Sequence, residues 1–265
     1  HGCGGTRLPH ERVRLARVAD HVAVVANPPV SAGILHEEAE QVRGGEIEPV
    51  RVADHDFDAE RARPALNDRA GLRVAVVGDY GVDDSAEGAV ADLIDSWDPD
   101  AVFTVGDNSY DNARLDDNVG KYYGHYIGDY KGHYGPGETL NRFFPTLGNH
   151  DYDDGGGVSA YRSYCTRPGT GIQSTNTSGT ETYYDVVMGP VHFFALDSNY
   201  MDPKQLEWLE KELAASGSDW KICFFHHPIY SSGGRHGSDL QLRAQLEPLF
   251  LKHGVDVVFT GHEHF

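Results

Sequence analysis

The sequence predicts an α/β fold built on a mixed β-sheet, and three observations lead to this prediction. From residue 72 onward, apolar β-branched runs such as Val74–Val77 and Ala101–Val105 alternate with amphipathic segments. Polar residues that can bind metals follow these runs directly, at the edge where open α/β sheets present their active sites. The runs Tyr183–Val187 and Val191–Leu196 are separated only by Met188-Gly189-Pro190, which indicates a hairpin and therefore a mixed sheet.

The regular elements follow in order along this part of the chain. Strand 72–77 precedes helix 84–97, which we expect to end before Pro99 because the residue before a proline disfavours helix. Strands 101–105 and 143–147 enclose a long loop whose tyrosines we expect to pack on the scaffold. The remaining expected elements are a loop over 153–178, helix 203–215 with Asp202 as N-cap and Pro203 in its first turn, strand 220–225, helix 239–253 with a break at Pro248 left open, and strand 255–260.

The chain divides into two predicted parts. Residues 1–70 are expected to form a β-rich N-terminal extension or small domain, with strand-like runs near 13–18 and 21–26. Residues 71–265 are expected to form the catalytic domain. The three cysteines give no disulfide framework, although a bridge between Cys3 and Cys165 stays open, and Cys223 is expected to be a buried small hydrophobe.

Composition narrows the function classes. The chain has 265 residues, of which 39% are hydrophobic, so a packed core is expected. Its formal net charge of −19 argues against nucleic acid or an anionic membrane as a bulk-charge partner. An anionic substrate would need a strong local cationic centre, whereas the simpler interpretation of the acidity is solubility. No apolar run has the length of a membrane span.

Ligand-type residues follow five of the apolar runs. Taken singly, each motif is typical of a turn, but five at one edge of a sheet indicate a binding site. Carboxylate, imidazole and amide ligands together suit Zn(II), Fe, Mn or Co. The five groups are Asp79, Asp107 with Tyr110, Asn149-His150-Asp151, His226-His227, and His262 with His264.

The spacing of these residues indicates two adjacent metals. If Gly261–His264 stays extended, His262 and His264 point the same way and Glu263 points away, so the two imidazoles could serve neighbouring ions. A carboxylate can bridge metals held about 3.5–4 Å apart. Asp107 is the predicted bridge because it follows an inner strand.

With these motifs, the sequence resembles the calcineurin-like metallophosphoesterases over residues 72–265. Tyr110 after Asp107 makes it similar to the purple acid phosphatases of that superfamily, in particular the bacterial type. The resemblance implies a sandwich of two mixed β-sheets flanked by helices. It also implies strands beyond the last motif, so C-terminal strands are expected to be missing from a sequence that stops at Phe265. The motifs, in order, are GDYG (78–81), GDNSY (106–110), GNHD (148–151), FHHP (225–228) and GHEH (261–264).

The resemblance also implies roles for individual residues. Asp79, Tyr110 and His264 would bind a first metal, Fe(III). Asn149, His226 and His262 would bind a second, Fe(II), Zn(II) or Mn(II), and Asp107 would bridge the two. His150 would face the substrate phosphate, with Asp151 orienting its ring. His236 would also face the substrate, the alternative being an exposed loop residue, while His227 is interpreted as structural.

The implied function is hydrolysis of a small phosphate monoester by hydroxide generated at the two metals. A phosphodiesterase or nucleotidase on the same metal site remains an alternative, and so does a catalytically silent, metal-stabilised interaction protein. His150 and Asp151 argue against the silent protein because neither is needed to hold metal. Adventitious binding of metal by the histidines is a weaker alternative. From the resemblance alone, we expect a secreted or periplasmic location.

Overall fold

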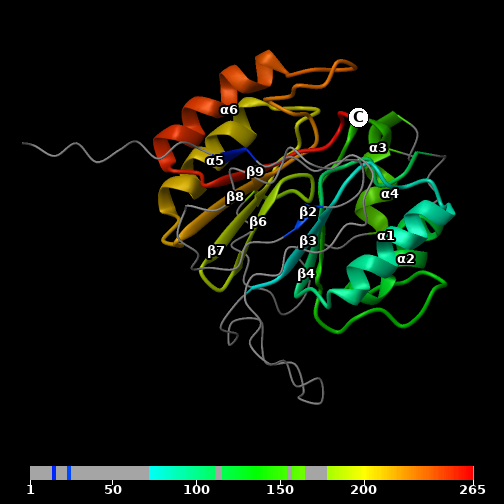
Figure 1. The fold of residues 1–265 in the computed structure, drawn as a ribbon. Helices are drawn as coiled ribbons and strands as arrows, with labels where there is room; N and C mark the ends of the chain where they lie inside the picture. The colour runs from blue at the N-terminus through cyan, green and yellow to red at the C-terminus, as the bar shows by residue number, and fades with distance from the viewer. Residues whose placement is uncertain are drawn as a thin grey trace, which may run out of the picture.

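The computed structural model describes residues 14–15, 23–24, 72–110, 115–153, 157–164 and 178–264. Within these residues, the strands form two sheets (Figure 1). One has four strands in the order β2-β3-β4-β5, and the other has five in the order β1-β9-β8-β7-β6. The predicted α/β class with two mixed sheets is therefore confirmed. None of the described helices is long and apolar enough to cross a lipid bilayer.

The four-stranded sheet carries the first half of the site. Strands β3 (Val74–Val77), β4 (Ala101–Thr104) and β5 (Phe143–Pro145) are parallel, and β2 (Ala23–Val24) joins β3 in the antiparallel sense. Every residue of β3, β4 and β5 is buried, as expected for parallel strands covered on both faces.

The five-stranded sheet carries the second half. The predicted hairpin is confirmed, because β6 (Tyr184–Met188) and β7 (Val191–Ala195) pair in the antiparallel sense. Strands β8 (Trp220–Phe224) and β9 (Val257–Phe259) continue the sheet in parallel. Parallel to β9 lies β1 (Arg14–Leu15). Apart from β1 and β2, the predicted N-terminal extension lies outside the described residues, and so do Cys3 and Cys165.

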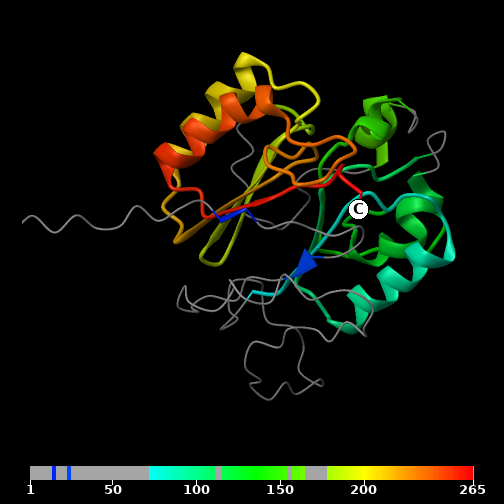
Figure 2. The same ribbon diagram turned by 45° about the horizontal axis from the view of Figure 1, so that its top comes forward.

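Helices cover the outer face of each sheet, and both views of the ribbon show this layering (Figure 1 and Figure 2). Helix α1 (Ser85–Ser96) packs on β3 and β4, while α5 (Pro203–Ala215) and α6 (Leu240–His253) pack on β7 and β8. The predicted N-cap of α5 is confirmed, because Asp202 accepts the backbone N–H of Gln205. Asp84 and Asp239 cap α1 and α6 in the same way.

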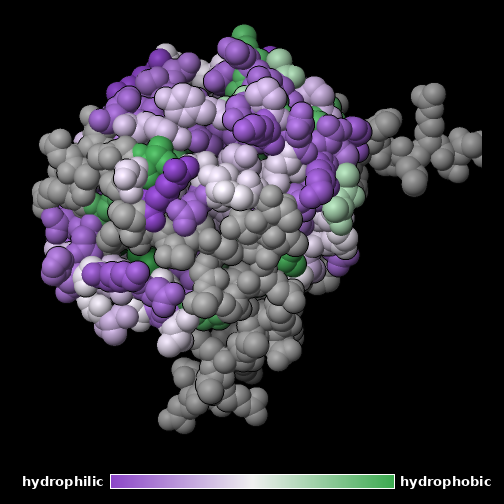
Figure 3. Space-filling view, turned by 180° about the vertical axis from the view of Figure 1, so that it is seen from behind, coloured by the Kyte–Doolittle hydropathy of each residue, from purple (hydrophilic) through white to green (hydrophobic). Residues whose placement is uncertain are grey.

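The main core lies between the two sheets. Phe103 of β4 stacks on Phe144 of β5 and on Phe193 of β7, and it meets Phe224 of β8 edge-on. Ring-centroid distances of 4.3–5.2 Å and an exposure of 1% for Phe103 show that the two inner faces interdigitate. Seen from behind the view of Figure 1, the surface of the described residues is mostly hydrophilic, with scattered hydrophobic side chains (Figure 3).

Two details differ from the sequence predictions, and the structure settles a third point that the sequence left open. The expected loop 108–142 contains a π-helical turn, η2 (Asp116–Gly120), then α2 (Lys121–Tyr123) and the 3-10 turn η3 (Gly124–Tyr126), because Tyr123 and Tyr126 are drawn into the α1 core. Their packing confirms the scaffold role expected for the tyrosines. The expected loop 153–178 contains α4 (Gly157–Tyr164). Helix α6 runs unbroken through Pro248.

Candidate metal centre

Both Gly-Asp pairs turn sharply at the ends of their strands. Asp79 follows β3 with φ +57°, and Asp107 follows β4 with φ +53°. Aspartate tolerates this left-handed conformation better than most residues do. The Asp79 amide donates to the carbonyl oxygen of Gly106 at 3.0 Å, so the two turns are joined directly. Adjacent parallel strands thus bring the two carboxylates to one edge, as predicted.

The third motif forms a short helix. Helix α3 (Asn149–Asp153) follows β5 after residues 146–148, with Asn149 as its first residue. Gly148 can have no side chain here, because a Cβ atom would lie 2.1 Å from Oδ1 of Asp107. This close approach lets the His150 amide donate to the same Oδ1 at 3.0 Å.

The last motif directs its side chains as expected, but by a different backbone path. His262 has φ +71° and is therefore left-handed rather than extended. Its amide donates to both carboxylate oxygens of Asp79 at 3.0 Å. His262 and His264 nevertheless both face the site, and Glu263 faces away from it.

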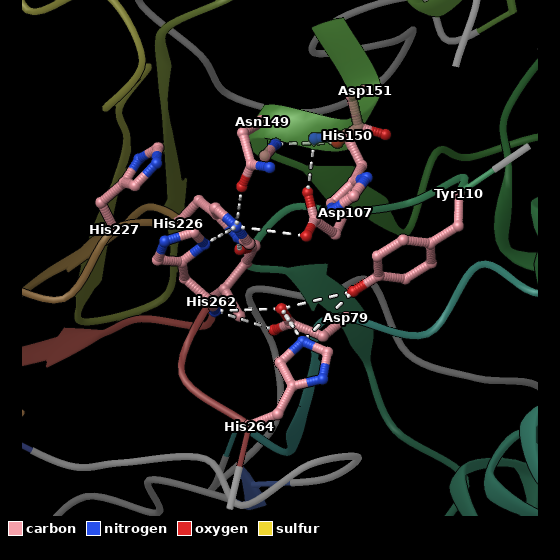
Figure 4. Close-up of polar contacts among 12 residues, drawn as sticks. Asp79, Asp107, Tyr110, Asn149, His150, Asp151, His226, His227, His262 and His264 are labelled. Atoms are coloured by element: carbon pink, nitrogen blue, oxygen red, sulfur yellow. Dashed lines mark hydrogen bonds and ion pairs between the residues drawn. The ribbon is translucent and has the colours of Figure 1, made fainter. Parts of the chain in front are cut away.

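Asp79, Tyr110 and His264 form the first group of donor atoms (Figure 4). Nε2 of His264 lies 2.9 Å from Oδ1 of Asp79 and 3.4 Å from the hydroxyl oxygen of Tyr110. The hydroxyl oxygen is 3.5 Å from the same Asp79 oxygen. An oxygen from a carboxylate, an oxygen from a phenol and an imidazole nitrogen thus converge from three separate motifs.

Asp107, Asn149, His226 and His262 form the second group (Figure 4). Nε2 of His226 lies 3.1 Å from Oδ1 of Asn149, 3.1 Å from Nδ1 of His262 and 3.3 Å from Oδ2 of Asp107. The other ring nitrogen of His226 is 2.8 Å from the carbonyl oxygen of Val105 and donates its proton there. Nε2 is therefore the atom that faces the three neighbouring acceptors.

The electrostatics of the second group favour a positive charge among these atoms. Burial lowers the pKa of His226, but the hydrogen bond and negative charge of Asp107 outweigh it and raise this pKa to about 9. Burial also works to raise the pKa of Asp107, yet its contact with His226 leaves that pKa below the usual value. Burial and the charge of His226 lower the pKa of His262 to about 3, so His262 offers a neutral imidazole.

This donor set fits metal ions. Neutral imidazole, carboxylate and amide oxygen are the ligands that Zn(II), Fe(II) and Mn(II) accept in proteins. Ligand atoms of Asp107, His226 and His262 lie within 4.8 Å of one another, close enough for one cation to reach all three. Asp107 is 1% exposed, and besides its contact with His226 in the second group, its carboxylate has a side-chain hydrogen bond with Tyr110 of the first group.

Comparison with known proteins identifies the family. A sequence model of the calcineurin-like phosphoesterases matches residues 72–265. The chain belongs to the calcineurin-like phosphoesterase family. It is similar to purple acid phosphatase 15 of Arabidopsis thaliana, with 29% identity over 223 residues, which are 72% of this chain and 40% of the relative. It is also similar to Fe(3+)-Zn(2+) purple acid phosphatase 12 of the same plant, with 32% identity over 45% of this chain and 27% of the relative.

Two solved structures share the calcineurin-like phosphoesterase fold with this chain. Purple acid phosphatase PPD1 from yellow lupin (Lupinus luteus) seeds has a TM-score of 0.54 at 19% identity, over 72% of this chain and 37% of that one. GAP50, the anchor in the inner membrane complex of Plasmodium, has a TM-score of 0.52 at 21% identity, over 72% of this chain and 66% of that one. The chain spans less than half the length of the curated relatives named above.

The structure of this calcineurin-like phosphoesterase also brings the predicted substrate-facing histidines to the site. His150 lies in α3, and its ring centroid is 4.6 Å from that of Tyr110. His236 is exposed on the loop between β8 and α6, and its ring centroid is 4.1 Å from that of His262. Their roles toward a substrate stay predictions.

Asp151 and His227 adjoin the two groups of donor atoms. Both oxygens of Asp151 accept hydrogen bonds from Asn108, and one also accepts the Gly148 amide. Burial and the charge of Asp107 raise the pKa of Asp151 to about 7. Asp151 thus connects the GDNSY motif, through Asn108, to the start of the GNHD motif at Gly148. Its expected contact with the ring of His150 stays a prediction. Nδ1 of His227 lies 2.9 Å from Oγ of Ser198, which fits the structural interpretation of this residue.

Two supporting residues were missed in the sequence. Asn108 is 2% exposed, and its amide oxygen accepts hydrogen bonds from Tyr80 and Thr104 while its nitrogen donates to Thr146 and Asp151. Glu263 is 6% exposed and accepts hydrogen bonds from three backbone amides. Each of these two residues lies inside one of the five motifs, Asn108 in GDNSY and Glu263 in GHEH. A polar residue in such a motif that is not needed as a candidate ligand was the signal that could have indicated a supporting role.

Proposed function

We propose that this chain is a phosphomonoesterase of the purple acid phosphatase type, which works with two metal ions. The observation that carries the proposal is the convergence of two donor groups from five motifs on either side of the buried Asp107. When bound, two metal ions would neutralise the phosphate and lower the pKa of water to about 7.

The residues of the chain would divide the work as follows. Asp79, Tyr110 and His264 would hold the first ion, for which Fe(III) is proposed. Asn149, His226 and His262 would hold the second, for which Fe(II), Zn(II) or Mn(II) is proposed, and Asp107 would bind both. A relative whose name includes Fe(3+)-Zn(2+) supports this choice of metals. In a chain with net charge −19, this centre would provide the attraction that an anionic substrate needs.

His150 would act on the substrate itself. Its backbone amide donates to Asp107 of the second donor group, and its ring packs on Tyr110 of the first. The imidazole therefore lies next to a member of each donor group. From that position, it would stabilise charge on the phosphate and give a proton to the leaving oxygen. His236, beside His262, would assist from the other side of the site.

The first experiment measures metal content by elemental mass spectrometry and hydrolysis of p-nitrophenyl phosphate and its bis-ester. We expect close to two metals per chain, one of them iron, and faster hydrolysis of the monoester. Faster hydrolysis of the bis-ester would favour a phosphodiesterase. Bound metals without hydrolysis of either ester would favour an interaction protein, a class that is relevant because GAP50 is described as an anchor.

A pair of histidine variants tests the role of His150. His150→Ala should keep the metals and lower kcat about 100-fold, the size typical of general acid catalysis. His125→Ala is the matched control, because His125 is an exposed histidine that contacts Asp95 outside the site. Unchanged turnover in His150→Ala, with metal content intact, would show that the assigned role is wrong.

A further inference from the structure

Glu263 lies between the metal-binding residues His262 and His264, but its side chain faces the opposite way. Oε1 accepts the backbone N–H of Arg235, and Oε2 accepts those of His236 and Gly237, all at 2.8 Å. The residue is 6% exposed. One buried carboxylate therefore binds three consecutive amides of the loop between β8 and α6.

The loop is shaped around this carboxylate. A Cβ atom on Gly233 would lie 2.1 Å from Oε1 of Glu263, so a glycine is required where the loop passes over it. Gly237, whose amide donates to Oε2, has φ +76°, a conformation that glycine adopts at low cost. Three successive amides that converge on one carboxylate form an anion-binding nest, which here is filled from within the chain.

The same loop carries the exposed His236. Its ring packs on that of His262, with 4.1 Å between centroids and 35° between planes. His236 has no metal-binding role in the proposed site, so its position depends on the path of the loop. Glu263 fixes that path from within the segment that also supplies two metal ligands.

We propose that Glu263 is a positioning residue that ties the substrate-facing loop, residues 231–237, to the metal-binding segment and so holds His236 in place for the phosphate ester. This inference rests on the proposed phosphatase function for its kinetic consequence. The tie itself does not depend on that function, because it consists of contacts within the chain. Hydrogen bonds to an ionised carboxylate are stronger than those to a neutral amide, so a charged residue is suited to hold three N–H groups.

Glu263→Gln tests the tie with little change in shape. The amide group of glutamine would place an NH₂ donor against at least one of the backbone N–H groups, so the loop should loosen while His262 and His264 stay in place. Asp84→Asn is the matched control, because Asp84 also accepts two backbone amides but caps α1 away from the site. We expect E263Q to keep its metals and to lose about tenfold in kcat/KM, the size of one charge-assisted hydrogen bond. D84N should match the wild type.

A double-mutant cycle separates positioning from general damage. If Glu263 acts through His236, E263Q should lower kcat/KM less than twofold in a His236→Ala background, although each single variant has a clear effect. Amide hydrogen exchange gives a readout that is independent of activity. Exchange of the 231–238 peptide should be faster in E263Q than in the wild type, and unchanged in D84N. Gly233→Ala disrupts the same contact from the loop, because the added Cβ would lie 2.1 Å from Oε1 of Glu263. It supplies a second test if E263Q folds poorly.

The outcomes distinguish this inference from the proposed function. Additive kinetic losses in the cycle, or unchanged exchange in both E263Q and G233A, would overturn the positioning role. A wild-type protein that binds metals but hydrolyses no phosphate ester would overturn the phosphatase proposal alone. Faster exchange in E263Q would still support the tie in that case.

Discussion

Glu87 carries a buried carboxyl group that makes the stability of this fold depend on pH. The residue lies in the first turn of α1 and is 2% exposed. Oε2 accepts the backbone amides of Val82 at 3.2 Å and Asp83 at 2.8 Å, whereas Oε1 has no hydrogen-bond partner among the described residues. Burial raises the pKa of Glu87 from 4.5 to about 8, although the two amides act in the opposite direction.

The sign and size of the effect follow from this shift. A carboxyl group whose pKa is raised by folding contributes most to the free energy of unfolding below its unfolded pKa of 4.5. This contribution is lost as the pH rises through the folded pKa of about 8. Each pKa unit corresponds to about 1.4 kcal/mol. Between pH 5 and pH 8, the titration of Glu87 should therefore lower the free energy of unfolding by about 3 kcal/mol.

The substitution Glu87→Gln removes this titration while it keeps the shape and the acceptor oxygen. We expect the free energy of unfolding of the wild type to fall by about 3 kcal/mol relative to E87Q between pH 5 and pH 8. Urea unfolding of both proteins at each pH, with the same metal supply, measures that difference. Metal binding and the other ionisable groups titrate alike in both proteins and therefore cancel. Parallel pH profiles, separated by a constant offset, would refute the argument that Glu87 is neutral in the folded state.

Three further predictions concern the core and the metal centre. Phe103→Ala should lower the free energy of unfolding by about 3–5 kcal/mol, measured by urea unfolding, because the buried ring contacts both sheets. Gly106→Ala should lose metal in elemental analysis, since its Cβ would lie 2.7 Å from Nδ1 of His226; normal loading would contradict this. A chelator should lower the melting temperature, because ions bound only by the folded chain stabilise it, and this decrease should shrink in His226→Ala.

Much of the fold could be predicted from local sequence because local rules and tertiary packing agree there. The run Val74–Val77 is buried on both faces, and Asp202 caps α5 as the sequence predicts. The helical turns over 116–126 could not be predicted, because they depend on Tyr123 and Tyr126 reaching a core made by distant residues. Helix α6 passes Pro248 because its apolar residues Leu246 and Phe250 stay buried on either side of it.

The convergence of the candidate ligands could be predicted because parallel strands end at one edge of their sheet. Their supports could not, since the hydrogen bonds of Asn108 and Glu263 join residues that are far apart in the sequence. Asn108 contacts Asp151 across 43 positions, and Glu263 contacts Arg235 across 28. No local pattern specifies which oxygen of a motif will meet which amide.

These long-range contacts connect the five motifs to one another. In the GDYG motif, the backbone amide of Asp79 donates a hydrogen bond to the carbonyl oxygen of Gly106. In the GHEH motif, the backbone amide of His262 donates to the carboxylate of Asp79. His226 joins the ring of contacts through the carbonyl oxygen of Val105, and its own carbonyl oxygen accepts the Gly261 amide. Each motif is therefore positioned by backbone groups of another.

The arrangement explains how left-handed turns persist at three candidate ligand positions. A non-glycine residue in this conformation costs about 1–2 kcal/mol, and Asp79, Asp107 and His262 all adopt it. The carboxylates of Asp79 and Asp107 offset that cost, because each accepts a hydrogen bond from a backbone amide of another motif. Asp107 uses Oδ1 for the His150 amide and keeps Oδ2 toward His226. The same side chain can therefore fix the scaffold and present a donor oxygen to a metal, which makes the centre preorganised by contacts that the chain itself supplies.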